Sequence, residues 1–125
     1  VAHDSHHMIV VCTCAEHMAL AANRLAEVGG GVSVRKDGRE LALVALPIAG
    51  LMSDSPAEEV AAKAAAMVQA MADCGCHLNN AYMQHSLLAL VVIPDLRISD
   101  LGLVDVRKFE LVPVVQEGGQ EDADA

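Results

Sequence analysis

The sequence predicts a two-layer α+β fold with a mixed β-sheet of about five strands and two main helices on one face. Two segments have apolar residues at helical spacing, two short runs are continuously apolar as in buried strands, and an Asp-Gly pair separates two β-rich arms. The length of 125 residues fits one domain, which we place at residues 1–116. Residues 117–125 are expected to form a disordered acidic tail.

The first two elements are expected between residues 8 and 28. Residues 8–12, MIVVC, are apolar and rich in β-branched side chains, which predicts a buried central strand. Residues 16–28 predict a helix with Met18, Ala21, Ala22, Leu25 and Val28 on one face. The three glycines that follow are interpreted as a helix cap and the start of a strand, because a phosphate-binding loop needs its glycines before a helix.

Residues 31–48 predict a hairpin. Asp37-Gly38 is a strong turn signal between the two β-rich arms, and Pro47 ends the second arm. Residues 48–55 contain a glycine and show no periodicity, so they are expected to form a loop.

A second helix is predicted after this loop. Ser55 can cap the helix, Pro56 suits its first position and Glu58 completes a capping box. The apolar face of the helix carries Val60, Ala64, Met67, Val68 and Met71. The methionines are interpreted as core packing, and Gly75 ends the helix.

The last third of the chain is expected to add two strands. Residues 77–86 are polar and irregular, whereas residues 87–93, LLALVVI, predict another central strand. Residues 95–106 read as loop-rich, with an Asp-Leu-Gly turn candidate. Residues 109–115 predict a last strand, and Pro113 indicates that it lies at a sheet edge.

The charge of the chain excludes several classes of function. The formal net charge is −9, and removing the four acidic residues of the tail leaves 13 acidic against 8 basic residues. With no basic stripe, nucleic-acid binding is not expected, because phosphate contacts need clustered Lys and Arg. No run of about 18 apolar residues indicates a membrane span, and no signal peptide is recognised, so a cytoplasmic setting is expected.

Four cysteines form two C-x-C pairs, Cys12-Thr-Cys14 and Cys74-Gly-Cys76. Four thiolates could bind zinc, but structural zinc sites usually use a spacing of C-x2–4-C. Disulfides are disfavoured in a reducing compartment. The thiols are therefore interpreted as buried or idle, with Cys12 as a small apolar residue at the end of a strand.

The clearest polar cluster opens the chain. It consists of His3, Asp4, Ser5, His6 and His7. A metal site needs three or more converging ligands, and the remaining histidines show no H-x-H or H-E-x-x-H pattern. Ser5 is not expected to act as a nucleophile, because adjacent side chains of an extended segment point to opposite faces. The cluster predicts either an incomplete functional site or a solvated segment.

A second candidate is the loop at residues 49–54, AGLMSD, between a predicted strand and a predicted helix. Loops at such junctions often carry function, but Ser53 and Asp54 are equally well explained as polar residues ahead of a helix. Residue patterns alone therefore indicate an α+β domain without a complete catalytic apparatus.

Four stretches of the chain resemble the C-terminal domain of adenine deaminase. They are VAHDSHHMIVV, MALAANRLAEVGGG, LPIAGLMSDSPAEEV and LLALVVIPDLRISDLGLVDVRKFELVPV, which span nearly the whole chain up to Gln116. The resemblance implies a family of amidohydrolases that convert adenine and water to hypoxanthine and ammonia. In that family the chemistry is done by a dinuclear iron or manganese centre in a (β/α)8 barrel.

Such a barrel takes about 200 residues or more, so it lies outside these 125 residues, and no metal or other cofactor is expected in this chain. The expected partners are the barrel domain of the same enzyme and adenine, and the chain is also expected to self-associate. The segments expected to face the barrel or the substrate hold Asp4, Ser5, His6, His7, Gly50, Leu51, Met52 and Ser53. The chain alone is predicted to be inactive.

The sequence departs from the family pattern at several positions. His7 stands where the family has Asn, and Cys12, Cys14 and Cys74 stand where Gly, Asn or other small polar residues are expected. A related aminohydrolase acting on another purine-like ring therefore fits as well. The alternative from another class is a free-standing α/β module that binds a ligand or partner without catalysis. An upstream reading frame with the ligands of a barrel metal centre would distinguish the two.

Overall fold

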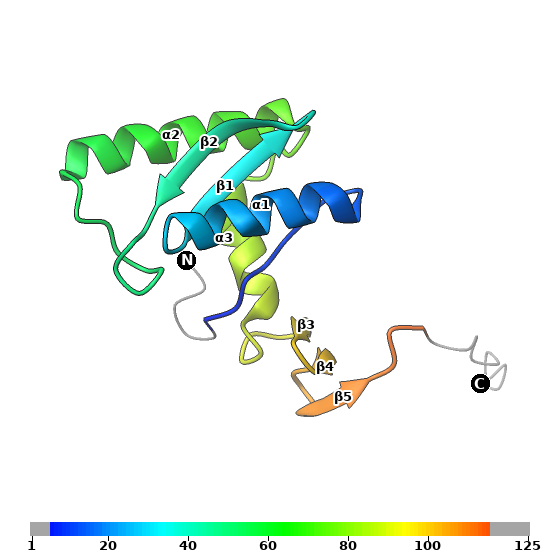
Figure 1. The fold of residues 1–125 in the computed structure, drawn as a ribbon. Helices are drawn as coiled ribbons and strands as arrows, with labels where there is room; N and C mark the ends of the chain where they lie inside the picture. The colour runs from blue at the N-terminus through cyan, green and yellow to red at the C-terminus, as the bar shows by residue number, and fades with distance from the viewer. Residues whose placement is uncertain (1–5, 116–125) are drawn as a thin grey trace, which may run out of the picture.

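The structure, a computed structural model, describes residues 6–115 and shows an α+β fold with two antiparallel sheets (Figure 1). In chain order the elements are α1 (Ala15–Glu27), β1 (Gly31–Lys36), β2 (Arg39–Ala45), α2 (Ala57–Asp73), α3 (Ala81–Ser86), the 3₁₀ helix η1 (Leu87–Ala89), β3 (Leu96–Ser99), β4 (Gly102–Asp105) and β5 (Glu110–Val112). The predicted α+β class is confirmed. The expected tail, residues 117–125, lies outside the described residues.

The predicted hairpin is formed by β1 and β2. Asp37 and Gly38 have φ angles of 50° and 74°, so both turn residues are left-handed, as a two-residue turn between strands requires. The strands are antiparallel, with Val34 opposite Ala42 and a register shift between Val34 and Arg35. The Asp-Gly pair therefore forms the turn that the sequence predicted.

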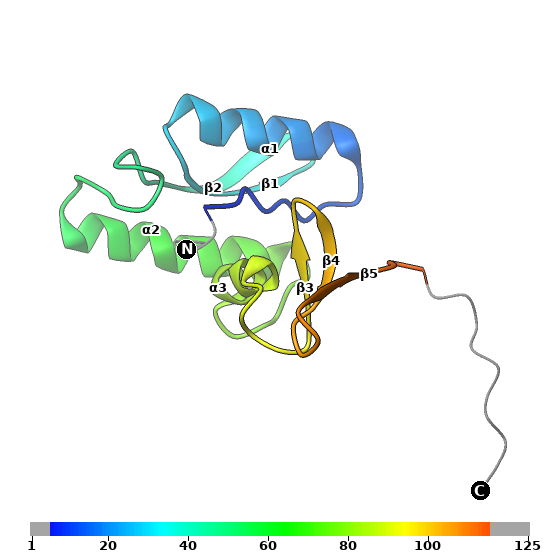
Figure 2. The ribbon, with the colours of Figure 1, turned by 90° about the horizontal axis from the view of Figure 1, so that it is seen from below.

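Helices α1 and α2 lie on opposite faces of the β1–β2 hairpin, as Figure 2 shows, whereas the sequence predicted both on one face. Neighbouring strands lie about 4.8 Å apart, and a helix with its side chains is about 10–12 Å across. One helix therefore covers one face of a two-stranded hairpin, and the second helix packs on the other face.

The main core lies between α2 and the hairpin. It consists of Val34, Ala42, Val44, Leu46, Met67 and Ala70. Met67 is completely buried, as predicted for a core methionine, whereas Val68 is 40% exposed and lies off the buried face. Helix α1, by contrast, has no buried residue.

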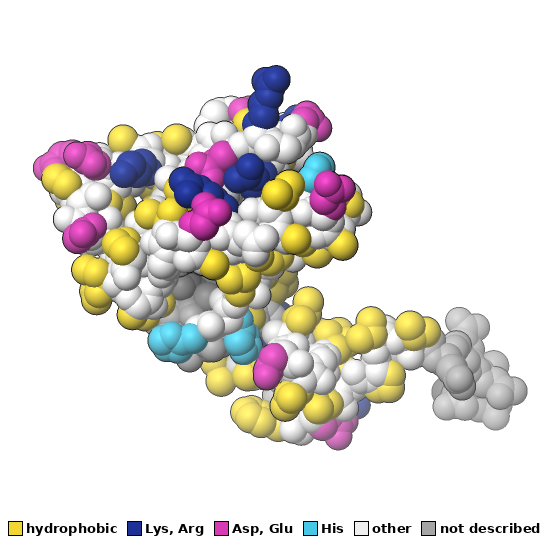
Figure 3. Space-filling model, viewed as in Figure 1, with side chains coloured by type: hydrophobic (Ala, Val, Ile, Leu, Met, Phe, Trp, Pro, Cys, Tyr) yellow, Lys and Arg dark blue, Asp and Glu magenta, His cyan; other side chains and the backbone are white. Residues whose placement is uncertain are grey.

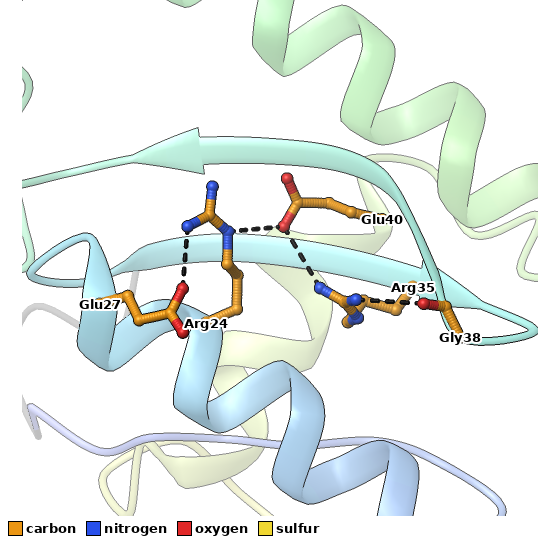
Figure 4. A network of polar contacts seen from close by, with 5 residues as sticks. All are labelled: Arg24, Glu27, Arg35, Gly38 and Glu40. Carbon is orange, nitrogen blue, oxygen red and sulfur yellow. Dashed lines mark hydrogen bonds and ion pairs between the residues drawn. The ribbon is translucent and has the colours of Figure 1, made fainter.

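Charged side chains link α1 to the hairpin (Figure 4). Arg24 Nε donates to Glu40 Oε2 at 2.9 Å, and Arg24 Nη1 donates to Glu27 Oε2 at 3.0 Å. Arg35 Nη1 donates to the same Glu40 oxygen at 3.4 Å, and Arg35 Nη2 donates to the Gly38 carbonyl at 3.2 Å. Hydrogen bonds with Glu27 and Glu40 raise the pKa of Arg24 above its usual value.

Both long helices end at the glycines that the sequence predicted. Gly29 and Gly75 have φ angles of 81° and 90°. At the end of α1 the Gly30 N–H donates to the Leu25 carbonyl at 2.8 Å, which is the long bond of a Schellman motif. These bonds satisfy carbonyl groups that have no partner within the helix.

The capping box predicted at the start of α2 is not formed. Pro56, with ψ of 145°, is the N-cap residue, and no side chain caps the helix. The helix thus begins one residue later than predicted, and Ser55 lies outside the capping position. The Ser55 N–H instead donates to Ser53 Oγ at 3.1 Å.

The strand predicted at residues 8–12 is absent from the structure. These residues form no helix or strand, and the side chains of Met8 and Val11 are 57% and 65% exposed. A strand needs a neighbour for its backbone hydrogen bonds, and in the described chain β1 and β2 pair only with each other. The apolar pattern was therefore insufficient to specify a strand here.

The strand predicted at residues 87–93 is also wrong. The polar stretch before it forms α3, and the apolar run continues as η1 and then as turns. The N–H groups of Leu90 and Ile93 donate to the carbonyls three residues earlier, at 3.2 Å and 3.1 Å. These local hydrogen bonds replace the inter-strand hydrogen bonds that a strand would need. Of the apolar run, Ala89 is buried.

A second sheet forms in the stretch predicted to be loop-rich. β3 and β4 pair around Asp100 and Leu101, which matches the Asp-Leu-Gly turn candidate, and β5 pairs with β4. β5 lies at the edge of the order β3-β4-β5, as Pro113 predicted, but is shorter than expected. The single mixed sheet is thus replaced by two antiparallel ones. None of the helices within residues 6–115 combines the length and the apolar character that a membrane span requires.

Candidate functional site

The structure describes two members of the first polar cluster, His6 and His7, while His3, Asp4 and Ser5 lie outside the described residues. His6 is exposed and has φ of 54°. His7 Nε2 lies 3.8 Å from Asp100 Oδ1 at the β3–β4 turn. The two side chains form an ion pair when the imidazole is protonated, so the start of the described chain is linked to the second sheet.

His7 also lines an open, mostly apolar hollow of about 580 Å³. Its other walls come from the last residue of η1 and the three residues after it, from the β3–β4 turn, from β4 and from the start of β5. The side chains of Leu101 and Phe109 are 76% and 78% exposed there. Such a surface can bind apolar groups, and His7 and Asp100 provide polar atoms at its margin.

The loop at residues 48–53 is held in shape by its own backbone. Ile48 and Met52 donate to each other's carbonyls, each at 3.1 Å, and Ala49 and Gly50 between them have φ angles of 57° and 72°. The loop packs closely on the glycines after α1, since a Cβ on Gly30 would lie 2.6 Å from the Gly50 Cα. The side chain of Met52 is 58% exposed.

The described parts of the two candidate segments make different contacts. His7 faces the β3–β4 turn, whereas the loop rests on the glycines after α1. A common surface formed by Asp4 to His7 and Gly50 to Ser53 therefore stays a prediction.

Of the two interpretations of the thiols, buried or idle, the first is wrong. Cys12, Cys14 and Cys74 are exposed, Cys76 is half-buried, and all four are free thiols. The ligand atoms of Cys12, Cys14 and His17 lie within 4.8 Å of one another. Sequence reasoning missed this cluster, because His17 was considered only against histidine-based motifs. The pattern C-x-C-x2-H would have indicated it.

A dinuclear iron or manganese centre does not fit this cluster. Within residues 6–115 it is the only group of three neighbouring His, Cys, Asp or Glu side chains. Two of its ligands are thiols, whereas manganese favours oxygen ligands and non-haem iron sites favour histidine and carboxylate. A pair of such ions would also need more than three ligands. The described residues therefore do not supply the centre that the family resemblance implies.

Comparison with known proteins identifies relatives over almost the whole chain. The sequence model of the family described as "Adenine deaminase C-terminal domain" matches residues 1–110. Proteins named adenine deaminase from Ruegeria pomeroyi and Paracoccus denitrificans are 78% and 72% identical over 116 and 115 residues. One from Moorella thermoacetica is 50% identical over 115 residues. The matches cover 92–93% of this chain but 19% of each relative, so the chain spans about a fifth of their length.

Proposed function

The chain belongs to the adenine deaminase C-terminal domain family, and on that premise we propose that it serves as an accessory domain of an enzyme that hydrolyses adenine to hypoxanthine and ammonia. The observation that carries this proposal is that the match to the Ruegeria pomeroyi protein covers 93% of this chain but only 19% of that protein. The remaining part of such an enzyme would supply the metal-bearing barrel, with iron or manganese. The reaction would belong to adenine breakdown in the cytoplasm.

The exposed apolar surface supports contact with another domain. The most exposed apolar side chains near the second sheet are Leu101, Phe109, Val114 and Val115, which are 76–81% exposed. Figure 3 shows hydrophobic side chains gathered over β3–β5 and the residues that follow. Patches of this kind mark interaction sites. We assign this surface to the catalytic domain, and the chain without that domain is expected to self-associate through it.

Two segments are proposed to face the barrel or the substrate. They are Asp4, Ser5, His6 and His7, and the loop of Gly50, Leu51, Met52 and Ser53. A segment that carries imidazoles can orient a heterocyclic base by hydrogen bonds, and the backbone-locked loop can present Met52 to an apolar ring. In this proposal the segments position groups around a centre held by the other domain and hold no metal themselves.

A chimeric enzyme tests the proposal. The last fifth of the Ruegeria pomeroyi protein, which is 78% identical to this chain, is replaced by the chain, and ammonia release from adenine is measured. We expect the chimera to deaminate adenine at a rate near that of its parent. A chimera that folds and retains its metal but is inactive would contradict the proposal. Activity on another purine with none on adenine would instead favour a related aminohydrolase.

Replacing His6 in the active chimera tests the proposed site. His6→Ala is expected to lower kcat/KM by about tenfold or more without loss of bound metal, because it removes a polar group near the substrate and no metal ligand. His77→Ala, which removes an exposed histidine after α2, is the matched control. Metal loss in His6→Ala, or kinetics equal to those of the control, would exclude this role for His6.

A further inference from the structure

We propose that Cys12, Cys14 and His17 form a binding site for a Zn²⁺ ion. Their three ligand atoms lie within 4.8 Å of one another. Cys12 and Cys14 are free and exposed, and His17 is half-buried on the first turn of α1. The site is separate from the dinuclear centre discussed above, and it does not depend on the proposed deaminase function.

Local backbone geometry brings the three side chains together. Cys14 is the N-cap residue of α1 and has an extended backbone, with φ of −146° and ψ of 147°. The chain bends at Thr13 and Cys14, directly ahead of the helix, and this bend brings the Cys12 and Cys14 sulfurs within 4.8 Å of each other. Side chains on a helix lean toward its N-terminus, so His17, three residues after Cys14, reaches back toward both thiols.

The chemistry of the cluster suits zinc. Thiolate and imidazole are the usual ligands of Zn²⁺, at about 2.3 Å and about 2.0–2.1 Å. Two thiolates balance the charge of the ion, so no carboxylate is required. In a tetrahedral site these bond lengths place neighbouring ligand atoms roughly 3.5–3.8 Å apart. The ligand atoms now lie up to 4.8 Å apart, so the longest distance between them must decrease by about 1 Å when the ion binds. Small rotations of exposed side chains achieve this.

The second C-x-C pair shows that residue types alone do not make this site. Cys74, Cys76 and His77 have the same side chains, yet no cluster of three forms there among the described residues. Cys74 is the C-cap of α2, and Gly75, with φ of 90°, turns the chain between the two cysteines. Thiolate charge is favoured at the start of a helix and disfavoured at its end, which also distinguishes the two pairs.

A bound ion would attach residues 6–14 to the first turn of α1. These residues form no helix or strand before α1 begins. Two of the ligands lie in this segment and the third lies on the helix, so the ion would cross-link the two. The fourth position of a tetrahedral site would be open to water or to a ligand from another domain.

Cobalt provides a spectroscopic test with the 125-residue chain. The chain is stripped of metal, kept reduced with a phosphine, and titrated with Co²⁺ after circular dichroism has verified its helices. We expect thiolate-to-cobalt charge-transfer absorption that saturates at one ion per chain and is displaced by Zn²⁺. The double variant Cys12→Ser/Cys14→Ser and the variant His17→Asn should each bind at least about tenfold more weakly. The matched control Cys74→Ser/Cys76→Ser should bind like the parent chain.

Alkylation of the thiols gives a second readout. Zn²⁺ should slow the reaction of Cys12 and Cys14 with iodoacetamide, measured by mass spectrometry, without protecting Cys74 or Cys76. A folded chain that shows no thiolate–cobalt absorption would overturn the proposal. So would binding that survives in Cys12→Ser/Cys14→Ser or is lost in the control.

Discussion

Gly31 occupies a position where only a hydrogen atom fits. A Cβ there would lie 2.0 Å from the Val44 carbonyl oxygen, and the residue has φ of 136°. This close approach forms where β1 leaves the cap of α1 and pairs with β2. The glycines after α1 thus allow the helix to end and β1 to begin, as predicted. They also leave room for the candidate loop, in which Gly50 packs on Gly30.

Gly31→Ala is expected to lower the free energy of unfolding by about 3 kcal/mol or more, since the added methyl group meets backbone and the conformation is strained. Gly38→Ala is the matched control, because a Cβ there has no atom within 4 Å and only the left-handed φ of 74° is unfavourable. It should cost about 1–2 kcal/mol. Urea unfolding of the 125-residue chain measures both, and equal losses would show that the close contact is unimportant.

At the scale of elements, α1 differs from α2 in how it is held. Helix α2 buries Met67 and Ala70 against the hairpin, whereas α1 buries no residue and is linked to the hairpin by the ion pair of Arg24 with Glu40. The pKa of Arg24 is raised in the folded state, so the protonated guanidinium stabilises the fold at every pH below its usual pKa. This stabilisation is lost only in strongly alkaline solution. Exposed ion pairs of this kind are screened by salt.

Glu40→Gln is therefore expected to loosen α1 selectively. The substitution removes the charge that Arg24 and Arg35 share, so amide hydrogen exchange in α1 should become faster while exchange in α2 stays unchanged. The effect should be smaller at high salt. Glu59→Gln, which breaks a pair with Lys63 within α2, is the control and should leave α1 unchanged. Equal acceleration in both helices would indicate general destabilisation and would contradict this view.

At the scale of the whole molecule, the described chain buries little of its apolar material. Hydrophobic residues make up 54% of the sequence, yet only nine apolar residues of the described part are buried. Three of these nine lie outside the main core, in α3, in η1 and directly after β4. Many large apolar side chains on residues 8–12, η1 and the second sheet are exposed. This imbalance is expected of a domain that completes its core against another part of a larger protein.

The isolated chain is predicted to fold but not to deaminate adenine. Hydrolytic deamination needs an activated water, and the one ligand cluster in residues 6–115 does not fit a dinuclear iron or manganese centre. Ammonia release from adenine is measured with the purified chain in the presence of added iron or manganese. Turnover that rises in proportion to the chain and survives controls for host enzyme would refute this prediction.

The sequence by itself determined the elements whose signals are local. The Asp37-Gly38 turn, the helices around Met18 and Met67 and the glycine ends of both helices need only neighbouring residues to form, and all appear in the structure. The family was also recognisable, because long ordered stretches of sequence carry the resemblance. The histidine segment and the loop at residues 50–53 were selected from sequence, and their roles remain predictions.

Only the tertiary structure decided how these elements are partnered. The apolar runs at residues 8–12 and 87–93 predict strands, but neither forms one. A strand needs a second strand for its backbone hydrogen bonds, and an apolar run alone does not determine which segment will pair with it. The same holds for the placement of α1 and α2 on two faces of a narrow hairpin. It holds as well for the approach of His17 to Cys12 and Cys14, which depends on where α1 begins and on the direction in which its side chains lean.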